Sequence, residues 1–321
     1  MILAGDVGGT KTLVGIFDTA GVRPQPLAVR AYPTTEYPDL STLAREFVRE
    51  VSHGPIRAAC FGVAGPVQAK TAQLTNAPWR IDGEQVGRDL GVSRVTLLND
   101  LQAMAYSVPV LLDTELHVLQ EGQPQQGGHM AVIAAGTGLG ESFVHNIGGR
   151  FVPSPSEGGH ADWAARSERD IAVLRDLLHR FGRAEVEHVV SGSGLVNVHR
   201  VTHTTPCQIV LDDEDPEAPA AISSAALERR CQGCMDALEI FVGAFGAEAG
   251  NLALRTLATA GVFVGGGIAP KILPALIDGR FMGAFRDKAP FDQLVARVPV
   301  KVILNPEAGL VGAAVCAATL E

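Results

Sequence analysis

The chain has 321 residues, of which 46% are hydrophobic, and its formal net charge is −9. This length and apolar content are enough for two domains with substantial cores. The 26 basic residues are scattered along the chain, so we expect no nucleic-acid partner. No apolar run approaches the roughly 20 residues that span a bilayer, so we expect no membrane partner and a cytoplasmic location.

A glycine-rich motif follows the apolar start of the chain. Its residues that suit phosphate binding are Gly5, Asp6, Gly8, Gly9 and Thr10. The glycines allow a tight turn that presents backbone amides to an anion, and the carboxylate could hold a magnesium ion. The motif is not a Walker A loop, because a threonine replaces the second glycine and the β-branched run at residues 13–18 favours a strand over a helix. The sequence therefore predicts a hairpin between two strands.

Strand-like and helical runs then alternate, which is typical of α/β architecture. The predicted elements are strands at residues 28–32, 56–63 and 95–98 and a helix that begins after Asp39. The last strand brings Asn99 and Asp100 to its carboxyl end, where ligands bind in such sheets. Asp100 could instead cap the helix that starts near Leu101. The polar residues 121–128 break the pattern, so we predict a domain junction between Met104 and His129.

A second glycine turn, at residues 136–140, lies between two further strand-like runs and indicates an internal duplication. The two strand–turn–strand units could hold the phosphates of one nucleotide from both sides. A third cluster, at residues 265–267, follows a short strand and precedes Pro270, which is predicted in the first turn of a helix. That cluster would suit the nucleoside end. For each cluster taken alone, an ordinary structural turn is the default interpretation.

Taken in order, the motifs resemble those of the bacterial glucokinases over nearly the whole chain. This family is related to the ROK sugar kinases and belongs to the sugar kinase, actin and Hsp70 ATPase superfamily. The matching segments are residues 5–10, 99–100, 136–140, 157–160, 187, 191–195, 250–253 and 265–268. The resemblance implies an α/β fold of two ribonuclease-H-like (actin-like ATPase) domains with an active-site cleft between them. We predict a small domain at 1–108 plus 303–321, on which the C-terminal helix packs, and a large domain at 109–302.

The resemblance further implies that D-glucose is phosphorylated to glucose 6-phosphate, the first step of its use in glycolysis, with ATP and Mg²⁺. Asp100 falls on the position of the family's catalytic base, which accepts the proton of the sugar 6-hydroxyl. The implied sugar-binding residues are Asn99, Asp100, Glu157, His160 and Glu187. The implied nucleotide-binding residues are Gly5, Asp6, Gly8, Gly9, Thr10, Thr137, Gly138, Gly265, Gly266 and Gly267, with Asp6 holding Mg²⁺ through water. The family also suggests a homodimer. Lys11 and Glu141 adjoin the phosphate turns and receive no catalytic role.

Other functions fit parts of the pattern. A kinase for another hexose or an amino sugar, or one that uses polyphosphate as the donor, would share these motifs. A sugar-sensing, non-catalytic ROK-type repressor would carry a DNA-binding domain ahead of the motif that here begins at residue 5. An actin-like or Hsp70-like ATPase without a sugar acceptor would not need the 157–160 loop or the Asn99–Asp100 pair.

The five cysteines are an odd number spread over a long chain, which favours reduced thiols over disulfides. Cys231 and Cys234 have a metal-like spacing. A structural zinc site needs four ligands, however, and the three-cysteine cluster that serves relatives together with a histidine at the position of His160 is absent. Because Cys207 is distant in sequence, we expect Cys231 and Cys234 to be buried thiols on one helical face. The helix predicted at 167–182 is expected to pack through its face of Ile171, Leu174, Leu178 and Phe181.

Overall fold

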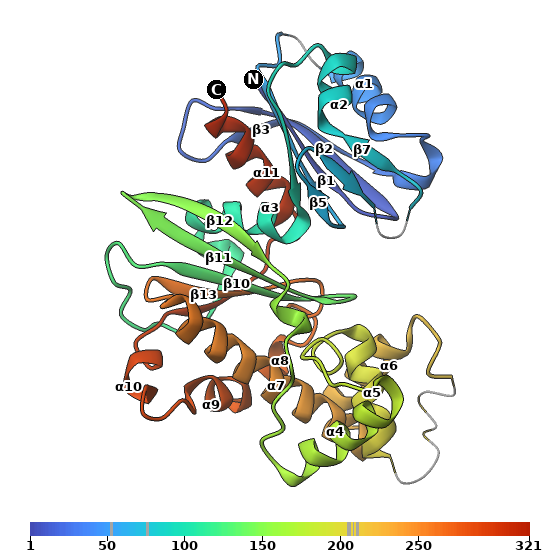
Figure 1. The fold of residues 1–321 in the computed structure, drawn as a ribbon, viewed down its shortest axis with the longest axis vertical. Helices are drawn as coiled ribbons and strands as arrows, with labels where there is room; N and C mark the ends of the chain where they lie inside the picture. The colour runs from blue at the N-terminus through green and yellow to red at the C-terminus, as the bar shows by residue number, and fades with distance from the viewer. Residues whose placement is uncertain (52–53, 75–76, 204–206, 208, 210–211) are drawn as a thin grey trace. The chain divides into compact units, whose positions relative to one another are not determined.

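A computed structural model describes residues 1–321 except 52–53, 75–76, 204–206, 208 and 210–211 (Figure 1). The chain divides into two compact units. Unit 1 comprises Met1–Asp113, Phe151–Pro155 and Asn305–Glu321, and unit 2 comprises Thr114–Arg150 and Ser156–Leu304.

Unit 1 is built on a five-stranded sheet with the order β3-β2-β1-β4-β8. Its strands are β1 (Ile2–Val7), β2 (Lys11–Asp18), β3 (Gln25–Pro33), β4 (Ala58–Val63) and β8 (Val95–Asn99). A small second sheet contains β5 (Val67–Gln68), β6 (Thr71–Gln73) and β7 (Arg80–Asp82). The helices are α1 (Leu40–Val51), α2 (Gly83–Leu90), α3 (Asp100–Ser107) and α11 (Ala308–Thr319), with 3₁₀ turns η1 (Thr34–Glu36) and η2 (Val108–Val110) and, at the unit boundary, η3 (Asp113–Glu115).

The predicted elements of unit 1 are confirmed. The first glycine motif joins β1 to β2, which pair as an antiparallel hairpin. Helix α1 begins after Asp39, whose Oδ1 accepts a hydrogen bond from the Thr42 backbone N–H at 2.7 Å. The C-terminal helix α11 belongs to this unit.

The two faces of this sheet have different partners. Side chains alternate between the faces along β1. Leu3 and Val7 join the cluster that contains Phe47 of α1, whereas Ile2 and Ala4 join the one that contains Leu310 of α11. The same alternation places Asp6 on the α11 face.

A six-stranded sheet has the order β12-β11-β10-β13-β14-β9, and its strands belong to unit 2 except for residues 151–155 of β12. Its strands are β9 (Leu116–Gln120), β10 (Met130–Ala135), β11 (Leu139–Ile147), β12 (Arg150–Ser156), β13 (Gly261–Gly265) and β14 (Val300–Ile303). The helices are α4 (Glu168–Phe181), α5 (Gly192–Thr202), α6 (Ala218–Leu227), α7 (Gln232–Thr256), α8 (Leu273–Leu276), α9 (Arg280–Arg286) and α10 (Asp292–Val295), with the 3₁₀ turn η4 (Gly158–His160).

The predicted internal duplication is confirmed by strand pairing. In unit 1, β1 pairs antiparallel with β2 and parallel with β4. In unit 2, β10 pairs antiparallel with β11 and parallel with β13. The glycine turn follows the first strand of each hairpin, so both units place it at the same point of the sheet.

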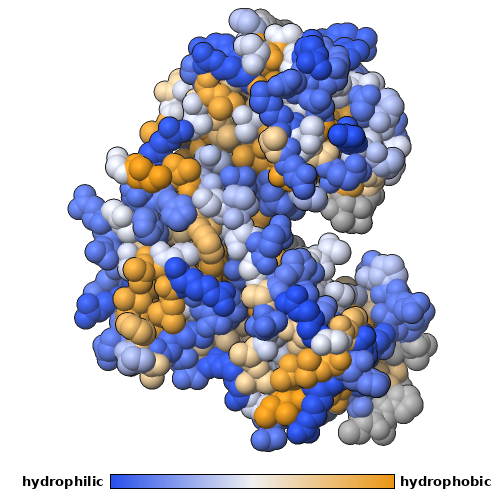
Figure 2. All heavy atoms as spheres, viewed as in Figure 1, coloured by the Kyte–Doolittle hydropathy of each residue, from blue (hydrophilic) through white to orange (hydrophobic). Residues whose placement is uncertain are grey.

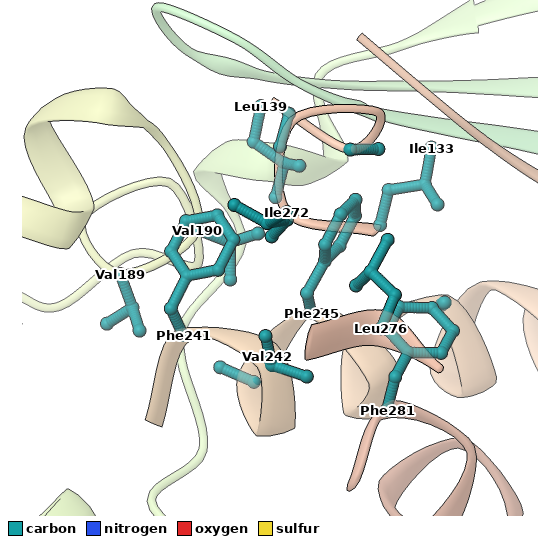
Figure 3. Close-up of a cluster of buried hydrophobic side chains, with 14 of the residues drawn as sticks. Ile133, Leu139, Val189, Val190, Phe241, Val242, Phe245, Ile272, Leu276 and Phe281 are labelled. Atoms are coloured by element: carbon teal, nitrogen blue, oxygen red, sulfur yellow. The ribbon is translucent and has the colours of Figure 1, made fainter. Parts of the chain in front are cut away.

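Helix α7 forms the centre of the unit 2 core. Figure 3 shows Phe241 and Phe245 of this helix among the aliphatic side chains of the cluster, with Phe281 of α9 nearby. The ring centroids of Phe245 and Phe281 lie 5.5 Å apart in an edge-to-face arrangement. Leu139, which lies within the second glycine turn and begins β11, is buried in the same cluster and anchors that turn to the core.

In the part of the chain that the structure describes, α7 alone is long and apolar enough to cross a membrane, judged by length and composition. The sequence expectation that no segment approaches that length does not hold for this 25-residue helix. Of its most apolar stretch of 18 residues, 72% is buried inside the protein. A core helix passes the same test, so the length of α7 is weak evidence for a membrane span.

Two sequence expectations about unit 2 are wrong. Helix α4 buries Val173 and Leu177, which lie outside the predicted face; of that face Leu174 packs partly buried against the same cluster, whereas Leu178 and Phe181 are 46% and 44% exposed. Figure 2 shows an apolar patch in the region of this helix, one of several on the face in view. Pro270 does not begin a helix, because consecutive turns occupy residues 266–272 and α8 starts only at Leu273.

Candidate active site

The turn between β1 and β2, residues 8–10, is held by a buried threonine outside the motif. Thr34 follows β3, and its hydroxyl donates a hydrogen bond to the Gly8 carbonyl oxygen at 2.7 Å. Because that proton is used, the Thr12 hydroxyl donates to Thr34 Oγ1 at 2.8 Å. The Thr34 backbone N–H donates to the Thr10 carbonyl oxygen at 2.9 Å. No local pattern marks Thr34, so sequence reasoning missed it.

The residues of the first motif are not equivalent. Gly5 lies within β1, and a Cβ there would stand 2.5 Å from the ring of Phe61, so its missing side chain serves packing. Gly8 and Gly9 are partly buried in the turn, and Thr10 is exposed. The turn therefore leaves backbone groups accessible for an anion.

Asp6 is a partly buried carboxylate beside the start of α11. A Cβ at Gly309 would lie 2.8 Å from Asp6 Oδ2, so only glycine leaves room for this approach. Burial, followed by the charge of Asp100, raises the pKa of Asp6 to about 6, and the Lys11 ammonium opposes this rise. Asp6 thus lies close enough to Asp100 for the charge of Asp100 to raise its pKa. Two carboxylates near each other suit a divalent cation, because oxygen donors are the ligands Mg²⁺ prefers.

Asn99 and Asp100, at the end of β8, have different roles. Asn99 Oδ1 accepts hydrogen bonds from the backbone N–H groups of Leu101 at 3.0 Å and Gln102 at 3.4 Å, so Asn99 is the N-cap of α3. The alternative in which Asp100 caps this helix is therefore wrong. Asp100 is the first residue of α3 and is exposed, although its Oδ1 also lies 2.8 Å from the Leu101 nitrogen. Its carboxylate remains accessible to a ligand.

The second glycine turn is closed by backbone hydrogen bonds. The Gly136 N–H donates to the Gly138 carbonyl oxygen at 2.8 Å, and the Gly192 N–H at the start of α5 donates to the Gly136 carbonyl oxygen at 2.9 Å. Thr137 at the tip of the turn is exposed. This turn thus lies against the beginning of α5, with its tip open.

Glu187 connects this turn to the next loop. Its Oε2 accepts a hydrogen bond from the Leu139 backbone N–H at 2.7 Å, and its own backbone N–H donates to the Gly159 carbonyl oxygen at 2.9 Å. A Cβ at Gly138 would stand 2.5 Å from the same Oε2. A Cβ at Gly159 would stand 2.2 Å from the Leu139 carbonyl oxygen. Two of the predicted segments, 136–140 and 157–160, are therefore in contact.

The 157–160 loop presents two polar side chains. Glu157 and His160 are both exposed, and His160 Nδ1 lies 2.7 Å from Glu185 Oε2. This hydrogen bond is the main cause of the raised pKa of His160. Arg183 donates to the His160 carbonyl oxygen at 2.6 Å and pairs with Glu185 at 3.3 Å. Glu185 orients the imidazole, and sequence reasoning missed it although it stands two residues before Glu187.

The third cluster lies beside the second. Gly265 ends β13, which pairs with β10. Gly266 has a positive φ of 87°, and a Cβ there would stand 2.2 Å from the Ala135 carbonyl oxygen, which immediately precedes the second turn. Gly267 is exposed, with open space around it. Two glycine turns thus meet at the ends of neighbouring parallel strands.

The buried carboxyl group of Glu141 lies against the 157–160 loop at Gly158. Glu141 is 1% exposed, and neither carboxyl oxygen has a hydrogen-bond partner of normal geometry. A Cβ at Gly158 would stand 2.0 Å from Glu141 Oε2. Burial, followed by the charge of Glu248, raises the pKa of Glu141 to about 8, while Arg255 opposes this rise. Glu141 is therefore mainly neutral at pH 7.

The fold places the protein among the actin-like ATPases, the class with two α/β domains that contain related hairpins and includes the sugar kinases. The chain belongs to the glucokinase family, whose model, described as "Glucokinase", matches residues 3–320.

Known proteins support this membership along the full chain. The chain is 38% identical to a glucokinase of Nostoc punctiforme, covering 100% of this chain and 99% of that protein. It is 39% identical to a glucokinase of a Synechocystis species, covering 98% and 97%. It is also similar to the crystal structure of a glucokinase from an Antarctic psychrotroph, with 28% identity, a TM-score of 0.88 and coverage of 99% and 98%.

Proposed function

We propose that this chain transfers the γ-phosphoryl group of ATP to the 6-hydroxyl of D-glucose. Family membership supports the reaction, and the local geometry of Asp100 supports its mechanism. Asn99 caps α3, and the exposed Asp100 carboxylate at the end of β8 would accept the hydroxyl proton. The attacking oxygen then forms the new bond to the γ-phosphorus as the bond to ADP breaks.

The sugar is assigned to acidic and imidazole side chains. Besides Asn99 and Asp100, the proposed contacts are Glu157, His160 and Glu187. Glu185 holds the proton on His160 Nδ1, so His160 Nε2 is the imidazole nitrogen left to meet a hydroxyl. One oxygen of Glu187 already accepts the Leu139 N–H, which fixes the carboxylate and leaves its other oxygen for the sugar.

The nucleotide is assigned to the three glycine turns. Gly9 and Thr10 in unit 1, and Thr137 and Gly138 in unit 2, would bind phosphates through backbone amides and a hydroxyl. Gly8 would contribute by shaping the turn, because its own N–H donates to the Lys11 carbonyl oxygen at 3.1 Å. The turn at Gly265–Gly267 would receive the nucleoside, and the open space at Gly267 suits a ligand. Gly5 contributes indirectly, since its missing side chain keeps β1 against Phe61.

Mg²⁺ is assigned to Asp6, through bound water. When bound, the ion would neutralise charge on the phosphate oxygens of ATP. Asp6 would orient the water shell, and the adjacent glycine at position 309 leaves its carboxylate unobstructed by a side chain. We also propose a cytoplasmic location and a homodimeric state, both of which rest on the family resemblance.

Formation of the sugar phosphate with a panel of acceptors tests the reaction, and release of ADP is measured beside it wherever ATP is the donor. The panel contains glucose, mannose, fructose, glucosamine, N-acetylglucosamine and no acceptor, each with ATP or polyphosphate as donor. We expect strong dependence on glucose and ATP. Equal release of ADP without an acceptor would contradict the proposal. A clear preference for another sugar would replace glucose as the acceptor, and a clear preference for polyphosphate would replace ATP as the donor.

A further inference from the structure

Five side chains that can bind a metal gather where α5 ends and α7 begins. The ligand atoms of His199, His203, Cys207 and Cys234 all lie within 4.8 Å of one another. Cys231 adjoins them, with its Sγ 3.2 Å from His203 Nε2 and 4.0 Å from Cys207 Sγ. The cluster lies at the opposite end of α5 from the second glycine turn, and none of its members is among the proposed substrate contacts.

Helical spacing and one glycine bring these residues together. His199 and His203 are four residues apart, and their ring centroids lie 3.9 Å from each other. The sequence predicts that Cys231 and Cys234 share a helical face. This is wrong, because Cys231 is the N-cap residue of α7 and precedes the helix. A Cβ at Gly233 would stand 2.3 Å from the His203 ring, so glycine is needed for the imidazole to approach α7.

The two imidazoles are arranged as metal ligands are. His199 is 3% exposed, and neither of its ring nitrogens has a hydrogen-bond partner. A buried imidazole without a partner is costly, and a metal ion would satisfy one of its nitrogens. His203 Nδ1 lies 3.1 Å from the His199 carbonyl oxygen and donates to it, which leaves the lone pair on His203 Nε2 facing the thiols.

We propose that this cluster is a structural zinc site with His199, His203, Cys207 and Cys234 as its ligands. Two thiolates and two imidazoles form a closed four-ligand set that suits Zn²⁺, and binding would release the protons of the two thiols. A tetrahedral zinc ion places its ligand atoms about 3.3–3.8 Å apart, so the four atoms need move only slightly inward. Cys231 stays beside the ion as a neighbouring thiol.

Sequence spacing alone brings only Cys231 and Cys234 near each other, which is too few ligands for zinc. In the fold, α5 packs against α7, and His199, His203 and the distant Cys207 lie beside Cys234. The site is also distinct from the one at the position of His160 in relatives, because His160 here pairs with Glu185. The ion would join the end of α5, the segment at Cys207 and the start of α7.

Metal content of the untagged, full-length protein, purified without chelators, tests the proposal. We expect about one zinc ion per chain by mass spectrometry of the metal, and loss of most of it in Cys207→Ser and in His203→Gln. The matched control is Cys60→Ala, which removes a buried thiol of unit 1 and should keep the zinc. Full retention of zinc in Cys207→Ser would overturn this ligand set.

A cobalt titration provides a second measurement that does not depend on folding of a variant. Wild-type protein is stripped with a chelator and titrated with Co²⁺. We expect near-ultraviolet absorption from thiolate-to-cobalt charge transfer and intense visible bands of tetrahedral Co²⁺, saturating at about one equivalent. Purified protein with less than about a tenth of an equivalent of zinc, together with no such absorption, would overturn the proposal.

Discussion

The hydroxyl of Thr34 donates a hydrogen bond to the carbonyl oxygen of Gly8 at 2.7 Å and thereby fixes the first glycine turn from a distant part of unit 1. This hydrogen bond is partly buried, and in a second, buried hydrogen bond Thr12 donates to the same hydroxyl. A turn that binds phosphate through its amides must be held in place before the ligand arrives, because freezing it on binding would reduce affinity. Thr34 is therefore a positioning residue for the proposed ATP site.

We expect Thr34→Val to raise the KM for ATP and to leave the KM for glucose unchanged. The substitution keeps the volume but leaves the Gly8 carbonyl oxygen and the Thr12 hydroxyl without their partner, which destabilises the protein by about 1–3 kcal/mol. Steady-state kinetics with each substrate varied in turn, together with urea unfolding, measure both effects. Thr34→Ser keeps the hydroxyl and is the matched control. Equal changes in both KM values would contradict the positioning role.

Asp100→Asn is expected to lower kcat by about 10²–10⁴-fold and to change glucose affinity by less than about tenfold, because the amide still hydrogen-bonds but cannot accept a proton. Calorimetry measures affinity and a coupled assay measures kcat. Asp82→Asn is the control: Asp82 caps α2, and asparagine caps a helix nearly as well. Near-normal turnover in Asp100→Asn would remove Asp100 from the role of base.

Gly159→Ala should loosen the 157–160 loop. The new Cβ would meet the Leu139 carbonyl oxygen at 2.2 Å, a backbone atom that cannot easily move, so we expect a loss of about 1–3 kcal/mol of stability and a higher KM for glucose. Thermal unfolding and kinetics check the two outcomes. Gly283→Ala, in α9 with open space around it, should be neutral or stabilising. If the two variants had the same stability and the same KM for glucose, the close packing of the 157–160 loop would not contribute to either property.

The parts of the site that the sequence predicts are those set by local patterns. Alternating apolar residues and adjacent glycines identify both hairpins, and the strand before Asn99 places the polar pair at its end. Thr34 and Glu185 escaped prediction because their partners lie 26 and 25 residues away, and only the folded sheet and loops bring them into contact. The choice of Asn99 over Asp100 as the cap also depends on side-chain geometry that residue types do not fix.

The same limit applies to helix faces. Helical periodicity offered one apolar face for α4, but the buried side chains are Val173 and Leu177. Phe181 stacks on His188 instead, with ring centroids 4.4 Å apart. Two apolar stripes on one helix compete, and the neighbouring elements decide which of them is buried.

The stability of the protein should depend on pH through Glu141. Its pKa is about 8 in the folded chain and near 4.5 in the unfolded chain, so between these values the folded state binds the extra proton. Stability therefore falls as pH rises from about 5 to about 8.

Glu141→Gln keeps the side chain neutral and should abolish this part of the slope, so that the variant gains stability relative to wild type at pH 8. Urea unfolding at a series of pH values measures the slopes. Glu84→Gln removes an exposed carboxylate paired with Lys70 and should leave the wild-type slope intact. Parallel slopes for wild type and Glu141→Gln would show that Glu141 ionises without a cost in stability in the folded protein. The neutral form of Glu141 would then not be needed to support the loop at Gly158.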